Sequence, residues 1–230
     1  MLKFYWLEYT NEDHPNKYSL VLYTKWCNLR CFGCHNRKLA WWDYDDSENI
    51  SCNICENQIN HVNVEDHFNE LTEEEIRMAL SSGLLDMIIF CGWEFLVNSV
   101  KQIKETIDFV RSIDSSLLIR IDTNGSFPEK MKELVEEWYV DGFAIDIKWP
   151  YWNSQYHDKI SDVMWLPQKA AESLFPRMID SLEISKKLEF TIYRTVLYPM
   201  IEDNNYFEII KEYTKSKLNK PHYFNEFTVI

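Results

Sequence analysis

The stretch "SLVLYTKWCNLRCFGCHN", residues 19–36, joins a short apolar run to three closely spaced cysteines. The run at 19–24 is typical of a buried strand. Cys27, Cys31 and Cys34 follow it directly, in the spacing Cys-x3-Cys-x2-Cys. In parallel β/α folds the reactive groups gather at the carboxyl ends of the strands, so we expect this loop to form part of a functional site.

Three neighbouring thiols suggest an iron–sulfur cluster with one open iron. A cubane cluster is usually held by four protein thiolates, so three would leave one iron free to bind a small molecule through amine and carboxylate groups. Soft thiolate ligands also favour such clusters over hard metal ions. Two alternatives remain: an incidental group of cysteines, and a zinc site with His35 as the fourth ligand. Zinc knuckles favour paired Cys-x2-Cys units with longer gaps, so the spacing favours the cluster.

Strand-like and helix-like segments alternate along the rest of the chain. We expect strands at 19–24, 84–92, 117–123, 141–148, 189–198 and 222–230. We expect helices at 71–83, 98–113, 128–139, 168–187 and 204–217. Thr72 and Glu75 fit a capping box at the start of the first helix. Repeated strand–helix units require parallel strands with helical crossovers, and six strands predict an α/β fold with a partial (β/α)6 barrel.

One segment interrupts this alternation. Residues 41–70 are polar, rich in Asn and acidic residues, and lack a long apolar period, so we interpret them as an insertion after the first predicted strand. Because no internal repeat or linker is evident, we expect 1–230 to be a single domain. Cys52 and Cys55 in the insertion, followed by His61 and His67, match a small second metal site, although free reduced thiols are the preferred interpretation.

Composition and charge limit the functional classes. The 230 residues are 46% hydrophobic and contain six cysteines, and they include 37 Asp and Glu against 24 Lys and Arg, a net charge of −13. Such an acidic chain would repel nucleic acid. We recognise neither a signal peptide nor a membrane span, so we expect a cytoplasmic protein whose cysteines act as ligands or free thiols rather than disulfides.

The cysteine spacing resembles the signature of the radical S-adenosylmethionine (SAM) enzymes. More closely, "CNLRCFGCHN" is similar to the activating enzymes of glycyl-radical proteins, namely the activases of anaerobic ribonucleotide reductase and of pyruvate formate-lyase. The resemblance continues through "LLDMIIFCGWEF", "IDTNGSFPEKMKELVEE", "DGFAIDIKWP" and "EFTIYRTVLYPMIEDNN". It covers most of the chain outside 41–70, and the ordered series is more specific than any single motif.

The resemblance implies a fold of the radical SAM type and assigns candidate site residues. Cys27, Cys31 and Cys34 would be the catalytic ligands of a 4Fe-4S cluster whose fourth iron is chelated by SAM. The cofactor-binding residues implied by the resemblance are Phe32, Gly33, Gly92, Trp93, Glu94, Asp122, Thr123, Asp146, Lys148 and Arg194.

Several of these positions match family motifs only in part. Gly92 and Glu94 fall in a Gly-Gly-Glu segment that holds the amino group of the methionine moiety, but Trp93 replaces its second glycine and Phe95 replaces the following proline. We expect the neighbouring Cys91 to pack in the core. Gly33 takes a position that contacts adenine in other members, with Phe32 adjacent.

The strand-end acids have a second implied role. Asp122, Thr123 and Asp146 match residues that bind a monovalent cation beside the cofactor carboxylate, and Arg194 matches an arginine near the cofactor. The alternative for "DTNG" and "DIK" is a turn followed by an ordinary strand-end salt bridge with Lys148. The alternative for Arg194 is a surface charge.

The implied function is reductive cleavage of SAM at the cluster to a 5'-deoxyadenosyl radical, which then generates a glycyl radical on a partner enzyme. The expected partners are an enzyme like anaerobic ribonucleotide reductase and an electron donor such as flavodoxin or ferredoxin, under anaerobic conditions. Two alternatives stay open. One is a radical SAM enzyme that modifies a small molecule or another peptide. The other is a non-catalytic iron–sulfur or zinc-binding adaptor.

Overall fold

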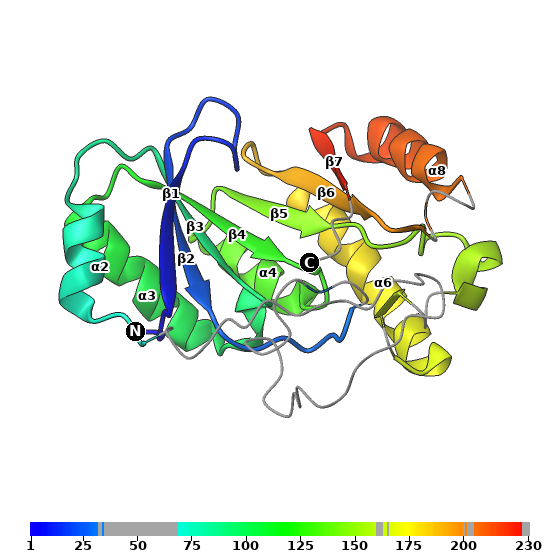
Figure 1. Ribbon diagram of the computed structural model, residues 1–230, viewed down its shortest axis with the longest axis horizontal. Coiled ribbons are helices and arrows are strands. Elements are labelled where there is room, and N and C mark those ends of the chain that lie inside the picture. The colour runs from blue at the N-terminus through cyan, green and yellow to red at the C-terminus, as the bar shows by residue number, and fades with distance from the viewer. Residues whose placement is uncertain are drawn as a thin grey trace.

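A seven-stranded sheet forms the centre of the protein in a computed structural model that describes residues 1–31, 34, 69–159, 163–164, 166–199, 201 and 205–226 (Figure 1). The strand order follows the chain: β1 (Trp6–Thr10), β2 (Ser19–Thr24), β3 (Met87–Gly92), β4 (Leu118–Thr123), β5 (Gly142–Asp146), β6 (Ile192–Leu197) and β7 (His222–Glu226). β1 runs antiparallel to β2, and every later pair is parallel. The sheet is curled into a half barrel.

Helices cover one face of this sheet, as Figure 1 shows for α3, α4 and α6. The regular helices are α2 (Glu73–Leu80), α3 (Val100–Ile113), α4 (Pro128–Glu136), α6 (Gln168–Ser185) and α8 (Tyr206–Tyr213). Shorter helical turns are η1 (Phe95–Val97), η2 (Ser154–Lys159) and η3 (Thr214–Leu218), the last of which has π-helical hydrogen bonding. Within the described residues, no helix combines the length and the apolar character needed to cross a bilayer.

Local sequence signals explain where the helices begin. At α2, the Thr72 hydroxyl accepts a hydrogen bond from the Glu75 amide at 3.2 Å, and the Glu75 carboxylate accepts one from the Thr72 amide at 2.7 Å. This confirms the predicted capping box. The Ser99 hydroxyl caps α3 through the Gln102 amide, and α4 starts with Pro128, whose fixed φ suits the first helical position.

The two faces of the sheet differ in chemistry. Alternate strand residues such as Ile88, Phe90, Ile119 and Ile121 are fully buried in the large apolar core that includes the helices. The concave face carries a smaller apolar cluster of Val21, Met87 and Ile89 and then becomes charged along β4 to β6. Because side chains alternate across a strand, the polar residues of the concave face share one space.

The structure confirms the predicted α/β class, the partial barrel and the six parallel strands, which are β2 to β7. The sequence analysis missed β1, which pairs with β2 from Trp6 opposite Tyr23 to Thr10 opposite Ser19. The strand predicted first is therefore the second of the sheet. The predicted insertion at 41–70 lies outside the described residues except for its last two.

Candidate active site

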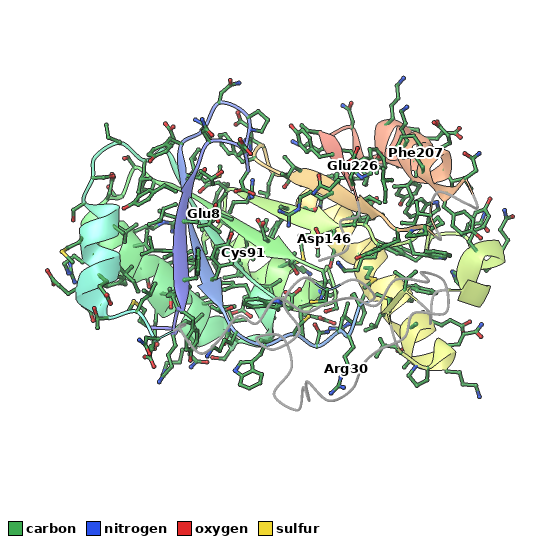
Figure 2. All side chains as sticks on the ribbon, in the orientation of Figure 1. Glu8, Arg30, Cys91, Asp146, Phe207 and Glu226 are labelled. Carbon is green, nitrogen blue, oxygen red and sulfur yellow. The ribbon has the colours of Figure 1, made fainter. Side chains whose placement is uncertain are left out.

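A cavity of about 230 Å³ lies at the edge of the sheet where the parallel strands end. It brings together residues from the loop after β2 and from the ends of β3 to β6, among them Cys91 and Asp146, which are labelled in Figure 2. The lining residues are Cys27, Leu29, Cys31, Cys34, Cys91, Gly92, Trp93, Asp122, Thr123, Asn124, Asp146, Lys148, Arg194, Val196 and Tyr198. The cavity thus gathers most of the predicted site residues, which are scattered over 168 positions of sequence from Cys27 to Arg194.

The cysteine loop begins with a sharp change of direction. Trp26 adopts a φ of +80°, which is unusual for a residue other than glycine and costs roughly 1–2 kcal/mol. Its carbonyl oxygen accepts a hydrogen bond of 3.1 Å from the Glu94 amide, so the loop is tied to the segment after β3. This turn carries the chain from the end of β2 into the cavity, where Cys27 follows immediately.

The sulfur atoms of the loop are partly buried and supported by amide donors. The Leu29 amide donates to Cys27 Sγ at 3.4 Å, and the Asn124 side-chain amide lies 3.9 Å from the same sulfur. Burial raises the pKa of the Cys27 thiol to about 12 and that of the Cys31 thiol to about 11. The free thiols are therefore protonated at neutral pH, and binding of a metal or cluster must displace their protons.

Two asparagines join the cysteine loop to the end of β4. The Asn124 side-chain amide donates to Asn28 Oδ1 at 2.9 Å, and the Asn28 amide donates to the Ser126 hydroxyl at 2.9 Å. Asn124 Oδ1 in turn accepts from the Ser126 backbone amide. The sequence analysis did not assign these residues a role. The sequence feature that could have identified them is their position inside "CNLRC" and "DTNG", two motifs predicted to meet at the same sheet edge.

Gly92 is required where β3 passes β2. Its φ is +116°, and a Cβ atom at this position would lie 2.5 Å from the Thr24 carbonyl oxygen and 2.6 Å from the Thr24 hydroxyl. Only glycine permits this approach. Trp93 follows and lines the cavity at the position where the related motif has a second glycine, while Phe95 is fully buried and stacks on Phe90 with ring centroids 4.9 Å apart.

Glu94 is placed differently from the other predicted cofactor residues, because it does not line the cavity. Its side chain is fully buried, and its carboxylate accepts hydrogen bonds from the Thr123 hydroxyl at 2.8 Å, the Asn124 amide at 2.6 Å and the Leu96 amide at 3.0 Å. Burial raises the pKa of Glu94 to about 7 despite these donors. The carboxylate therefore links η1 to the end of β4.

Five charged residues form a continuous network on the concave face, which we call the ionic ladder: Arg120, Asp122, Arg194, Asp146 and Lys148. Arg120 Nε donates to Asp122 Oδ1 at 3.0 Å, and Arg194 Nη1 donates to Asp122 Oδ2 at 2.8 Å. Arg194 Nε donates to Asp146 Oδ1 at 3.2 Å, and Lys148 Nζ donates to Asp146 Oδ2 at 3.1 Å. Neither arginine is a surface charge, and the predicted salt bridge of Asp146 with Lys148 is only one link of the network.

Cys91 corrects one expectation. We expected it to be buried in the core, but it is only partly buried and lines the cavity, because the odd-numbered residues of β3 face the concave side. Burial raises the pKa of the Cys91 thiol, and among charged groups Asp122 and Arg194 influence it most. Cys91 therefore lies at the end of β3, whereas the other three thiols belong to the loop after β2.

Some predicted site residues lie outside the described part of the chain. These are Phe32, Gly33, His35, Cys52 and Cys55, together with His61 and His67. Among the residues that are described, no three His, Cys, Asp or Glu side chains are grouped to hold one metal ion. A single zinc requires sulfur ligands at about 2.3 Å from the metal and hence about 4 Å from one another. A cubane cluster instead binds each thiolate through a different iron, so its ligands need not be grouped around one ion.

Comparison with known proteins finds one related sequence and several structures of similar fold. No protein-family model matches it. A Methanocaldococcus jannaschii protein, whose name assigns it provisionally as a glycyl-radical enzyme activating enzyme, is 25% identical over 205 residues, covering 88% of this chain and 71% of that protein. A solved structure, described as native anSMEcpe with bound AdoMet and Kp18Cys peptide, overlaps with a TM-score of 0.50 and 15% identity, over 91% of this chain and 51% of that chain.

The structural likeness to anSMEcpe concerns the fold, and this chain spans about half of that protein's length. Escherichia coli coproporphyrinogen III oxidase (HemN), described as a radical SAM enzyme, overlaps with a TM-score of 0.42 and 9% identity, over 64% of this chain and 32% of that chain. This last overlap is too small to support an inference.

Proposed function

We propose that the chain is a radical SAM enzyme that activates a partner enzyme by removing a hydrogen atom from a backbone glycine. Such an enzyme would use a 4Fe-4S cluster and SAM as cofactors. The name of the Methanocaldococcus relative supports the more specific activity, as does the similarity of the cysteine loop to glycyl-radical activases.

The observation that carries this proposal is the convergence of Cys27, Cys31 and Cys34 on one cavity at the carboxyl ends of the parallel strands. Their thiol chemistry suits iron, and the Leu29 amide already donates to one of the sulfur atoms. In our proposal Cys91, the fourth thiol lining the cavity, is not a ligand, because it lies at the end of β3 and not in the loop that carries the other three thiols. One iron would then be left for the cofactor.

When bound and reduced, the cluster would supply the electron that splits SAM into methionine and a 5'-deoxyadenosyl radical. The chain's own residues would position the cofactors. Asn28 and Asn124 hold the cysteine loop against β4, while the buried carboxylate of Glu94 fixes the segment after Gly92. Lys148 and Arg194 present positive charge to the cavity, which suits the carboxylate of the methionine moiety.

The partner and the electron donor form the finer part of the proposal. We propose a glycyl-radical enzyme of the anaerobic ribonucleotide reductase type as the partner, flavodoxin or ferredoxin as the donor, and the anaerobic cytoplasm as the setting. These assignments rest on the resemblance of "CNLRCFGC" and the strand-end motifs to the reductase activases. A monovalent cation is not part of the proposal, because cationic side chains already donate to the carboxylates of Asp122 and Asp146.

A second candidate function follows from Trp93. Its bulky side chain lines the cavity where the related motif has glycine, which favours a substrate of different shape. This candidate is a radical SAM enzyme acting on a small molecule or on another peptide. It shares the cluster and SAM with the first candidate and differs only in the group that donates the hydrogen atom.

The deciding experiment is an anaerobic assay of reconstituted protein with iron, sulfide, dithionite and SAM. We expect 5'-deoxyadenosine to form, and a glycine-centred electron paramagnetic resonance (EPR) doublet to appear when the anaerobic reductase of the same organism is added. Deoxyadenosine without a glycyl signal, but with turnover of a metabolite or peptide, would favour the second candidate. No SAM cleavage by protein carrying a full cluster would favour the non-catalytic adaptor instead.

Matched cysteine variants test the ligand assignment. We expect Cys27→Ala, Cys31→Ala and Cys34→Ala to lose bound iron and the visible absorption of the cluster. The control is Cys91→Ala, which removes a thiol from the same cavity and should retain both. Equal iron loss from Cys91→Ala would contradict the assignment of an open iron, because that thiol would then be a fourth ligand.

A further inference from the structure

We propose that the Arg194 guanidinium takes the place of a bound monovalent cation between Asp122 and Asp146, so that cofactor binding by this chain is independent of sodium and potassium. The inference rests on the proposed function, because the cation site is one that the resemblance to pyruvate formate-lyase activases implies. The residues are present, but their contacts do not fit an exchangeable ion.

Cationic donors occupy the carboxylate oxygens of Asp122 and Asp146. The Arg194 side chain reaches across from β6 and donates to both acids, to Asp122 Oδ2 at 2.8 Å and to Asp146 Oδ1 at 3.2 Å. The remaining oxygens accept from Arg120 and from Lys148. All four oxygens therefore already receive a cationic donor, whereas an alkali ion needs several free oxygen ligands.

The register of the strands places Arg194 beside both acids. Asp146 of β5 pairs directly with Arg194 of β6, and Asp122 of β4 pairs with Ala144, two residues before Asp146. Side chains two residues apart on a strand point to the same face, so Asp122, Asp146 and Arg194 all lie on the concave side. The contact is thus built into the sheet and does not depend on a mobile loop.

The charge balance of the ionic ladder also disfavours a further cation. The ionic ladder contains three cationic groups, Arg120, Arg194 and Lys148, against two carboxylates, which leaves one positive charge in excess. Arg120 is fully buried and Asp122 is 5% exposed, so water screens these two charges poorly, while Arg194 and Asp146 are 22% and 35% exposed. An added cation would lie beside a guanidinium in this environment and would be repelled.

The protonation states of Arg194 and Asp146 are consistent with a permanent positive charge between the two acids. Burial opposes the charge of Arg194, but the carboxylates of Asp122 and Asp146 raise its pKa above its ordinary value. Burial likewise opposes ionisation of Asp146, yet Lys148 and Arg194 lower the pKa of that carboxyl below its usual range. Arg194 therefore stays charged and supplies the positive charge beside the cofactor carboxylate that an exchangeable ion would otherwise provide.

The test compares the effect of cations on the wild-type protein and on Arg194→Gln. Two quantities are measured in choline, sodium and potassium chloride at equal ionic strength: the unfolding midpoint without SAM, and the dissociation constant of SAM for the anaerobic, cluster-loaded protein. For the wild type we expect the same midpoint and a dissociation constant within about twofold in all three salts. Arg194→Gln leaves two carboxylates without their shared donor and should gain a cation site.

In Arg194→Gln, we expect sodium or potassium to raise the midpoint by about 2–4 °C over choline and to tighten SAM binding. Arg194→Lys keeps a positive charge and should remain insensitive to the salt. The control Arg77→Gln removes an exposed arginine that pairs with Glu73 on α2 and should behave as the wild type. The midpoint needs no enzymatic activity, so it tests the inference even if the chain fails to cleave SAM.

Three results would overturn the inference. The first is a wild-type midpoint or SAM affinity that depends on sodium or potassium beyond the effect of choline. The second is an Arg194→Gln protein that folds and gains no dependence on either ion. The third is an Arg194→Lys protein with the same cation dependence as Arg194→Gln, because the charge at this position would then not matter. If Arg194→Gln does not fold, the wild-type and Arg194→Lys series decide the question.

Discussion

Replacing Gly92 by alanine tests whether close contact between β2 and β3 positions the cysteine loop. The new Cβ would meet three Thr24 atoms, namely the carbonyl oxygen at 2.5 Å, the hydroxyl at 2.6 Å and the amide nitrogen at 2.7 Å. Non-bonded contacts of carbon are comfortable near about 3.5 Å, so β2 must move by about 1 Å. Because Thr24 lies three residues before Cys27, the displacement would reach the loop directly.

The expected cost has two parts. The φ of +116° at Gly92 is unfavourable for alanine by about 1–2 kcal/mol, and the enforced overpacking adds about 1–3 kcal/mol. The total of about 2–5 kcal/mol is a large share of the roughly 5–15 kcal/mol that stabilises a typical domain. Gly83 offers a matched control, since its φ is +67° and no atom lies within 4 Å of an added Cβ. Gly83→Ala should cost only the backbone part, about 1–2 kcal/mol.

Urea denaturation followed by far-ultraviolet circular dichroism measures both variants, and iron content after reconstitution reports on the loop. We expect Gly92→Ala to lose about 1–3 kcal/mol more than Gly83→Ala and to retain less iron. Equal losses of stability, with full iron content in both proteins, would refute the reasoning, because the contact with Thr24 would then have no energetic consequence.

Two further predictions concern groups around the site, and a third concerns the start of α2. Burial raises the pKa of Glu94 to about 7, so the contribution of this residue to the free energy of unfolding is complete below about pH 4.5 and is lost as the pH rises through 7. In urea titrations, the wild type should lose at most about 3 kcal/mol of unfolding free energy relative to Glu94→Gln between pH 4.5 and 8. Parallel pH profiles of the two proteins would contradict this. A double-mutant cycle of Asn28→Ala and Asn124→Ala should give a coupling energy of about 0.5–1.5 kcal/mol for their 2.9 Å hydrogen bond, whereas additive losses would argue against the link. Thr72→Ala should lower the free energy of unfolding by about 1 kcal/mol through loss of the capping box without changing iron content, and unchanged stability would contradict that cap.

The parallel part of the sheet was predictable because its strands are apolar runs separated by amphipathic helices. "SLVLYT" is buried at five of its six residues, as expected for an interior parallel strand. β1 has only partly buried and exposed positions, so "WLEYT" lacks the one-sided apolar pattern by which a strand is recognised. Its place is set by hydrogen bonds to β2 across the edge of the sheet, which depend on the tertiary fold.

The site residues at the strand ends were predictable from the sequence, whereas the residues that form hydrogen bonds with them were less so. Asp122 and Asp146 follow from the rule that functional groups gather where parallel strands end. Arg120 was missed, although its place two residues before Asp122 put it on the same face of β4. The partners of Glu94 were beyond sequence reasoning, because the turn at η1 directs its carboxylate toward β4 and away from the cavity.

Because Asp122 is shared between two arginines, substitutions at these positions are coupled in the evolution of the sequence. Removing that one carboxylate would leave the fully buried Arg120 and the partly buried Arg194 without their shared acceptor, and removing either arginine would take one donor from Asp122. No single substitution within this ionic network is neutral for stability. Related sequences should therefore keep the whole set or replace several of its members in concert, and a census of homologues would reveal these positions varying together.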